Sequence, residues 1–378
     1  MKDIFPGFHS KSKQEIDALW ANGHLFFDTN VLLNLYRYSD QTREAILDLI
    51  SKFKDEKRIW LPHQTALEYN RNRYEVISAQ EKEYNTFKND INKIQEDLKS
   101  TSKPPFLSKE LHKSLNDIFK KVQEEVQSSL ELYASYFNED PIYDKLTEIF
   151  KNRITKAYSE EELEKIKKEG ILRYEKNIPP GYADTKNKND DKKFGDLILW
   201  KQIIQKSSEL QKPVILITDE KKEDWWWKIK NGKTIGPRQE LIEEIYRESK
   251  AEFHMYSSEK FIVYSQEHLK QRVNQKAINE IKEIQQSRMR EYLHSLKSKK
   301  ETEESIDELD VSSLIKLRES TKFHIDRLQS EIDNFTLEPE EKIEESSEFI
   351  NLRRKLLKYR AELIHLNLMM KKKGIYKY

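Results

Sequence analysis

The sequence predicts a three-layer α/β/α domain with a parallel sheet and a helical insertion, followed by an all-α, coiled-coil-like module. Two observations predict the first part: short apolar runs typical of buried strands occur between residues 24 and 257, and segments with helical spacing of apolar residues alternate with them. Strands that alternate with helices build right-handed βαβ units whose sheet is covered on both faces. A third observation, heptad spacing of apolar residues after about residue 265, predicts the helical module.

Four segments have the composition of short buried strands. They are the apolar run at 25–27, RIWLP at 58–62, KPVILITDE at 212–220 and AEFHMYS at 251–257. The third is the clearest, because most of its apolar residues are β-branched. An Asn-Gly pair between Ile229 and Ile235 predicts an additional small hairpin.

Amphipathic helices are expected between these strands. Residues 39–53 carry their apolar side chains on one helical face, and a helix that begins at HQTALEY is expected to run to about residue 98. Residues 76–178 predict an insertion of three or four helices with breaks at 102–106, 138–141 and 155–161. A polar loop at 177–193 precedes a further helix at 194–210.

Heptad-like spacing dominates the C-terminal third. One repeat contains Thr321, Ile325, Leu328, Ile332 and Phe335, and a second contains Phe349, Leu352, Leu356, Tyr359, Leu363, Leu366 and Met370. A looser repeat runs through Ile281, Met289, Tyr292 and Leu296. We therefore predict two domains, 1–265 and 266–378, of which the second is a helical hairpin or coiled coil that can self-associate or bind a protein partner.

The composition excludes several kinds of chemistry. The chain has 378 residues, a net charge of +1 and no cysteine, which excludes disulfides, thiolate metal sites and cysteine nucleophiles. Any metal must be held by oxygen or imidazole ligands. Since no stretch approaches the roughly 20 apolar residues that span a bilayer, we expect a soluble, cytoplasmic protein without a membrane partner.

Four carboxylates are predicted to meet at one edge of the sheet. Asp28 and Asp219 follow predicted strands, Asp196 begins a helix, and Glu68 lies within two turns of the second strand's end. The carboxyl ends of parallel strands share one edge, where ligands bind. Clustered carboxylates favour a hard cation such as Mg²⁺ or Mn²⁺. Taken singly, Asp28 and Asp196 are more commonly explained as helix caps, Glu68 as a solvated helix residue and Asp219 as a turn residue.

Five motifs that occur in order between residues 20 and 260 resemble those of a known family. They are FFDTNVLLNLYRY, LPHQTALEYNRNR, PPGYAD, KKFGDLILWKQI and VILITDEKKEDWW. Together they resemble the PIN-like nucleases, specifically the bacterial subgroup with a large helical insertion. The resemblance implies a nuclease that acts on single strands and uses Mg²⁺ or Mn²⁺ at three or four acidic residues.

Carried over motif by motif, the resemblance implies that the catalytic and metal-binding residues are Asp28, Glu68, Asp196 and Asp219. Glu220 or Asp224 can share or replace the last position, since that motif is crowded with acids. Asn30 is expected to orient the first ligand.

Several other side chains are candidates for substrate contact. Arg71, three residues after the predicted second ligand, and Lys193, before a helix start, are the predicted substrate-binding residues. Arg73 is expected to be a solvated surface charge. Tyr69, Tyr182 and Trp225 could stack on unpaired bases, although the tryptophan run that contains Trp225 also suits core packing.

We therefore expect a metal-dependent nuclease, specifically an endoribonuclease, that hydrolyses phosphodiester bonds of RNA or, second, of single-stranded or structured DNA. By analogy, similar bacterial proteins suggest a toxin or an anti-phage effector. The alternative is a catalytically weak PIN scaffold that binds nucleic acid or protein. A phosphatase or nucleotide-binding protein is a weaker alternative, because no Gly-rich phosphate loop is present.

Overall fold

The chain divides into two compact units, Met1–Gln285 and Gln286–Tyr378. The computed structural model describes residues 6–9, 11–99, 104–184, 192–230, 233–287 and 311–335, and single residues between 352 and 370. The division falls later than the predicted boundary at 265/266, because the helical residues 275–287 pack into the core of the first unit through Ala277, Ile278 and Ile281. No helix among the described residues has the length and apolar character needed to cross a membrane.

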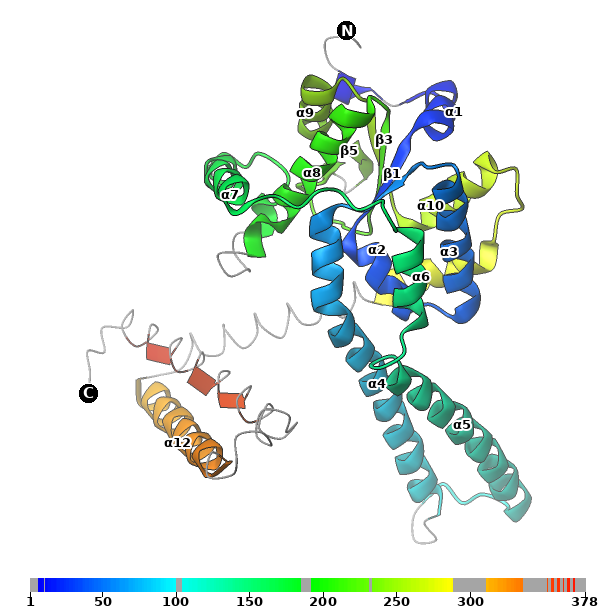
Figure 1. The fold of residues 1–378 in the computed structure, drawn as a ribbon. Coiled ribbons are helices and arrows are strands. Elements are labelled where there is room, and N and C mark those ends of the chain that lie inside the picture. Colours follow the sequence, from blue (N-terminus) through cyan, green and yellow to red (C-terminus); the bar gives the residue numbers. More distant parts are fainter. Residues whose placement is uncertain are drawn as a thin grey trace. The chain divides into compact units, whose positions relative to one another are not determined.

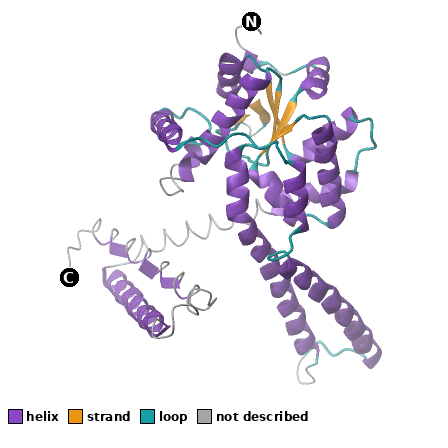
Figure 2. Ribbon diagram, in the orientation of Figure 1, coloured by secondary structure: helices purple, strands orange, loops and turns teal. Residues whose placement is uncertain are grey.

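A four-stranded parallel sheet lies at the centre of the first unit (Figures 1 and 2). Its strands are β1 (His24–Phe27), β2 (Ile59–Trp60), β3 (Val214–Ile217) and β6 (Phe253–Tyr256), in the order β2-β1-β3-β6. Leu25 pairs with Ile59 on one side and with Ile215 on the other. The four strands coincide with the four predicted apolar segments, which confirms the predicted parallel α/β fold.

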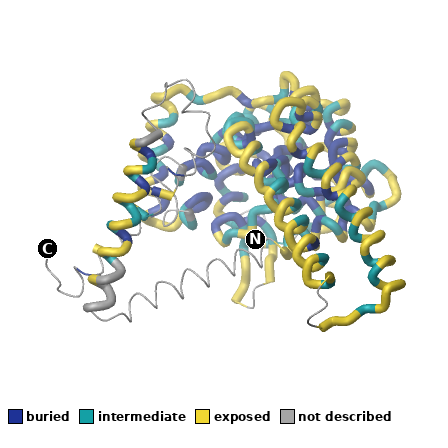
Figure 3. Tube along the Cα trace, turned by 90° about the horizontal axis from the view of Figure 1, so that it is seen from below, coloured by how far each residue is buried: buried dark blue, intermediate teal, exposed yellow. Residues whose placement is uncertain are grey.

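Helices cover both faces of the sheet and form three layers. The first face is covered by α1 (Lys13–Asn22), α3 (Asp40–Asp55) and α10 (Ser258–His268); the second by α8 (Gly195–Leu210) and α9 (Gln239–Ser249). Alternate residues of β1 serve the two faces, since Leu25 and Phe27 pack in one core cluster and Phe26 in the other. Figure 3 shows the buried residues gathered within this unit, inside a more exposed surface of helices.

The predicted insertion is helical. It contains the distal part of α4 (His63–Leu98), then α5 (Lys109–Ser135), α6 (Pro141–Ile149) and α7 (Glu160–Glu175). α4 ends where the sequence predicted, and its distal half extends from the sheet together with the antiparallel α5 (Figure 1). Hydrogen bonds of 2.8 Å from Gln123 to Asn92 and Gln95 join the two helices. α4 therefore begins at the edge of the sheet and ends in the helical hairpin that it forms with α5.

A buried ion pair fixes the loop that precedes α8. Arg173 on α7 donates two hydrogen bonds, of 2.6 and 2.7 Å, to the carboxylate of Glu244 on α9, and a third to the carbonyl of Pro179. The Trp200 indole donates to the same carboxylate at 2.8 Å. Next to this loop, β4 (Trp226–Lys228) and β5 (Thr234–Pro237) form an antiparallel pair, as the Asn-Gly signal predicted.

The second unit is helical where it is described. α12 (Val311–Phe335) contributes Leu328 and Ile332 to a core that also contains Leu352 and Leu356. These residues belong to the two heptad repeats recognised in the sequence, and their packing confirms C-terminal helices. Met289, Tyr292 and Leu296 of the third repeat lie outside the described residues.

Candidate active site

Asp28 lies at the carboxyl end of the central strand β1. It is the N-cap of α2 (Thr29–Leu33), and its carboxylate accepts a 2.6 Å hydrogen bond from the backbone amide of Thr29. Its other oxygen accepts hydrogen bonds from Asn30 Nδ2 at 2.8 Å and Thr218 Oγ1 at 2.6 Å. Asn30 therefore makes the orienting contact that was predicted, whereas Thr218 was not singled out in the sequence.

Glu68 and the start of α8 lie against each other. Glu68 projects from the second turn of α4 and accepts hydrogen bonds from Thr29 Oγ1 at 3.1 Å and Gln64 Nε2 at 2.7 Å. A Cβ atom at Gly195 would lie 2.6 Å from Glu68 Oε1. The absent side chain at position 195 therefore makes room for Glu68 directly beside Asp196.

The electrostatics of Asp28 indicate which carboxylates share its surroundings. Burial, together with the negative charges of Asp196, Glu68 and Glu220, raises the pKa of Asp28 to about 7, even though the hydrogen bond from Thr218 lowers it. Three acidic side chains are thus close enough to oppose ionisation of Asp28. Two of them, Asp196 and Glu68, are predicted site residues that the fold brings together with Asp28.

Asp219, the fourth predicted residue, has a different environment. One of its carboxylate oxygens accepts hydrogen bonds from the backbone amide of Ser258 at 2.9 Å and from Gln285 Nε2 at 2.8 Å. The other accepts from Asn34 Nδ2 at 2.9 Å and Ser258 Oγ at 2.8 Å. Four protein donors thus bind a carboxylate with about four acceptor positions. Asp219 joins η2 (Asn34–Tyr36), α10 and the helical residues 275–287 to the end of β3.

Glu220 and Asp224 were the alternatives for this position, and the structure separates them. Asp224 is fully buried and accepts hydrogen bonds from the amides of Gly181 and Ala183, so it fixes the PPGYAD loop. Glu220 stays partly exposed and faces the cluster. Lys222 lies between two acids, with its Nζ 3.1 Å from Glu220 Oε2 and 3.7 Å from Asp196 Oδ2. Nothing in the sequence pattern had marked Lys222.

The predicted substrate-contact residues differ in their exposure and in their contacts. Arg71 is exposed on α4, and Lys193 is half-buried with its Nζ 5.1 Å from the ring centroid of Phe194. Arg73 is not the expected solvated charge, because it forms a 2.8 Å ion pair with the buried Asp140. Tyr69 and Trp225 are also poor stacking platforms for bases: only 4% and 2% of their surfaces are exposed, and both are core residues.

The donor set fits a hard divalent cation. Its atoms are carboxylate oxygens, which Mg²⁺ and Mn²⁺ prefer, and the raised pKa of Asp28 marks a carboxylate that a nearby cation would stabilise. Within the described part of the chain, no three Asp, Glu or His side chains already stand at metal-ligand spacing. Binding would therefore draw Asp28, Glu68, Asp196 and Glu220 closer together and displace the Lys222 ammonium.

Fold and site together define a class of protein: a three-layer α/β/α domain with acidic side chains at the carboxyl edge of a parallel sheet. A family model described as PIN like domain matches residues 24–241, more than half of the chain, and the chain belongs to this PIN-like domain family. PIN-like domains are generally nucleases. Comparisons with curated proteins and with solved structures gave no significant match.

Proposed function

We propose that this chain is a metal-dependent nuclease that hydrolyses phosphodiester bonds, with RNA as the preferred substrate. The observation that carries the proposal is that Asp196, Glu68 and Glu220 surround the buried Asp28: burial and these negative charges raise its pKa to about 7, so a cation bound among them would favour the ionised carboxylate. We assign metal binding to Asp28, Glu68 and Asp196. For the fourth position we favour Glu220 over Asp219, because the charge of Glu220 acts on Asp28, whereas each oxygen of Asp219 accepts two hydrogen bonds from other parts of the fold. The donors to Glu220 are the amides of Lys221 and Lys222 on one oxygen and the Lys222 ammonium on the other.

When bound, Mg²⁺ or Mn²⁺ would polarise the scissile phosphate and lower the pKa of an attacking water. The protein's contribution is to hold the ligands in place. Asn30 and Thr218 fix one oxygen of Asp28, and Gln64 and Thr29 fix Glu68. Arg71, three residues beyond Glu68 on α4, is exposed and suited to bind a phosphate of the same strand.

The test compares wild type with Asp28→Asn and Asp196→Asn on single-stranded RNA and DNA, with Mn²⁺ and with a chelator. We expect wild-type cleavage that needs the metal and that falls by at least about 100-fold in either variant. Arg73→Lys is unsuitable as a control because it disturbs a buried pair, whereas Lys93→Gln on the exposed part of α4 is suitable. Cleavage that persists in both Asn variants would refute the assignment.

We further propose that the cleavage activity restrains growth, as a toxin or an anti-phage effector does. The expected result is growth arrest after induced expression of wild type, and normal growth with Asp28→Asn at equal protein level. Sequencing the 5′ and 3′ ends of the cut nucleic acids would identify the substrate. Growth arrest by the Asn variant would contradict this proposal without affecting the nuclease assignment.

The alternative function, a catalytically weak scaffold, is favoured by Lys222. Its ammonium already neutralises part of the charge on Asp196 and Glu220, so it competes with a metal. If this reading is correct, wild type binds Mn²⁺ weakly and Lys222→Met gains affinity. If the nuclease reading is correct, wild type cleaves, and Lys222→Met alters the Mn²⁺ concentration required.

We also propose that the second unit mediates self-association. On α12, 66% of the Phe323 surface and 41% of the Ile315 surface are exposed, beside the buried heptad residues. Exposed apolar side chains on a heptad helix suit a further helix. Light scattering of the full chain and of a chain that ends at Gln285 tests this: a monomeric full chain would contradict it.

A further inference from the structure

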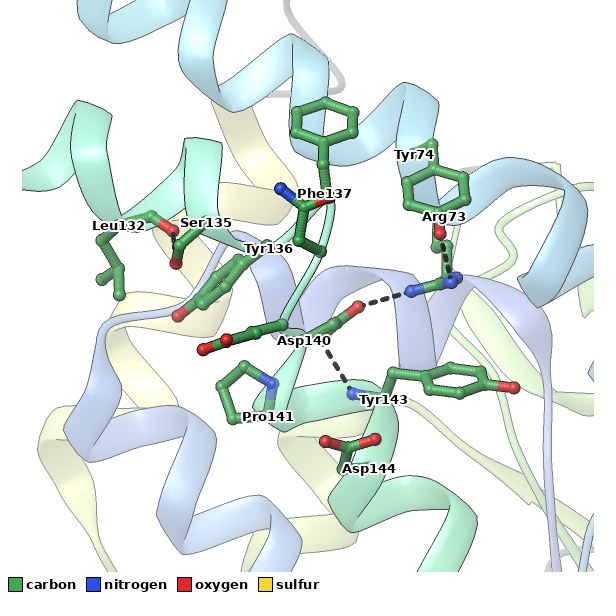
Figure 4. A pocket seen from close by; sticks show the side chains of 12 residues that line it. Arg73, Tyr74, Leu132, Ser135, Tyr136, Phe137, Asp140, Pro141, Tyr143 and Asp144 are labelled. Atoms are coloured by element: carbon green, nitrogen blue, oxygen red, sulfur yellow. Dashed lines mark hydrogen bonds and ion pairs between the residues drawn. The ribbon is translucent and has the colours of Figure 1, made fainter.

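A pocket of about 680 Å³ lies where the C-terminal end of α5 and the start of α6 meet α4 (Figure 4). It is separate from the carboxylate cluster, and the proposed nuclease chemistry does not use it. Its walls carry aromatic rings from three segments: Tyr74 on α4, Tyr136 and Phe137 after α5, and Tyr143 on α6. A pocket of this size accommodates a small organic ligand or a protruding side chain.

The aromatic wall is partly open to solvent. Tyr74 and Phe137 stack with an interplanar angle of 6° and ring centroids 5.7 Å apart, yet 41% and 39% of their surfaces are exposed. Figure 4 shows Arg73 between Tyr74 and Tyr143, with its guanidinium carbon 4.1 and 4.3 Å from their ring centroids. The ring faces at this pocket therefore already bind one cation.

The charges around the pocket are predominantly negative. The charge of Arg73 is matched by Asp140, 2.8 Å away and 5% exposed. Glu139 and Asp144 also line the pocket, are exposed, and have no ion-pair partner among the residues that the structure describes. The nearest lysine in the sequence, Lys145, pairs instead with Glu44 on α3 at 2.7 Å. Two uncompensated carboxylates thus border the aromatic rings.

We propose that this pocket binds an organic cation, a guanidinium or alkylammonium group. Such a group can lie against the exposed ring of Phe137, beside the Tyr74 ring that Arg73 already contacts, while its N–H groups donate to Glu139 and Asp144. The same carboxylates repel phosphate, so the pocket is not a base-stacking subsite for the nuclease substrate. The cation is either a free polyamine or a basic side chain of a peptide, since both present the same chemistry.

The test measures binding to the full chain by calorimetry without nucleic acid. The probes are arginine amide, its uncharged analogue citrulline amide, spermidine, and a short arginine-containing peptide. We expect saturable binding of arginine amide and at least about tenfold weaker binding of citrulline amide. Asp144→Asn should weaken binding of arginine amide about two- to fivefold, and Phe137→Leu by a similar factor.

Matched control positions lie on α4, in the part of the α4–α5 hairpin outside the pocket. Glu83→Gln and Phe87→Leu remove the same kinds of group from exposed positions and should leave the affinity unchanged. Tighter binding of spermidine than of the peptide identifies a free polyamine, and the reverse identifies a basic peptide. Equal affinity for citrulline amide, no saturable binding of any cation, or equal losses in the control variants would overturn the proposal.

Discussion

Gly195 offers a direct test of the proposed site, because the proposed ligand Glu68 occupies the space that a side chain at position 195 would fill. The substitution Gly195→Ala adds one methyl group at the start of α8, immediately before Asp196. Its Cβ would lie 2.6 Å from Glu68 Oε1, whereas ordinary van der Waals contact begins at 3.4 Å. Glu68 must therefore move by about 0.8 Å, since it is the flexible partner in this contact.

The expected effect is large on catalysis and small on stability. Displacing a catalytic group by about 1 Å can reduce the rate roughly 100-fold. The movement also strains the hydrogen bonds that Glu68 accepts from Gln64 and Thr29. Alanine also restricts the unfolded chain more than glycine does, which stabilises the folded protein by about 0.4–1 kcal/mol. This gain offsets part of the free energy lost when Glu68 is displaced. The thermal midpoint should therefore change by only a few degrees.

The assay measures Mn²⁺-dependent cleavage of single-stranded RNA together with the thermal midpoint. Gly236→Ala is the matched control, because a Cβ there meets nothing within 4 Å. We expect about 100-fold lower activity in Gly195→Ala and wild-type activity in Gly236→Ala. Activity within threefold of wild type in a stably folded Gly195→Ala protein would refute the reasoning that Glu68 must be held beside Asp196.

Three further predictions concern ligand identity, stability and pH. Asp219→Asn should lower the thermal midpoint and have little direct effect on Mn²⁺ affinity, whereas Glu220→Gln should weaken Mn²⁺ binding and leave the thermal midpoint unchanged. Calorimetry measures the Mn²⁺ affinity, and thermal melting measures the stability. Weaker Mn²⁺ binding in Asp219→Asn but not in Glu220→Gln would restore Asp219 as the ligand. Arg173→Met leaves the buried Glu244 carboxylate with only the Trp200 indole and the Lys201 ammonium, whose Nζ lies 3.5 Å away. Loss of the buried pair should lower the free energy of unfolding in urea by about 3 kcal/mol, and a loss below about 1 kcal/mol would contradict this. Burial lowers the pKa of His254 to about 4, so the unfolded chain binds the extra proton first as the pH falls. Protonation of His254 in the unfolded chain should therefore lower the unfolding free energy from about pH 6.5 toward pH 4, so wild type should lose more stability over this range than His254→Gln, which lacks this contribution.

The sequence alone determined the fold class, because the governing signals are local. Short apolar runs and the helical period between them each depend on neighbouring residues, and the strands and helices they predict were found, as was the antiparallel pair β4–β5 that the Asn-Gly pair indicated. It also predicted that Asp28, Glu68 and Asp196 would converge, since strand ends and helix starts meet at one edge of a parallel sheet. The length of α4 followed from an uninterrupted helical pattern without Gly or Pro.

Tertiary structure decided which acid near the end of β3 faces the site. Asp219, Glu220 and Asp224 stand within six residues, and their spacing does not distinguish them. Their hydrogen-bond partners distinguish them. Ser258 and Gln285, far along the chain, donate to Asp219, and the loop amides of Gly181 and Ala183 donate to Asp224. A hydrogen bond to a distant residue leaves no local pattern in the sequence. For the same physical reason, only the folded chain placed Lys222 between Asp196 and Glu220.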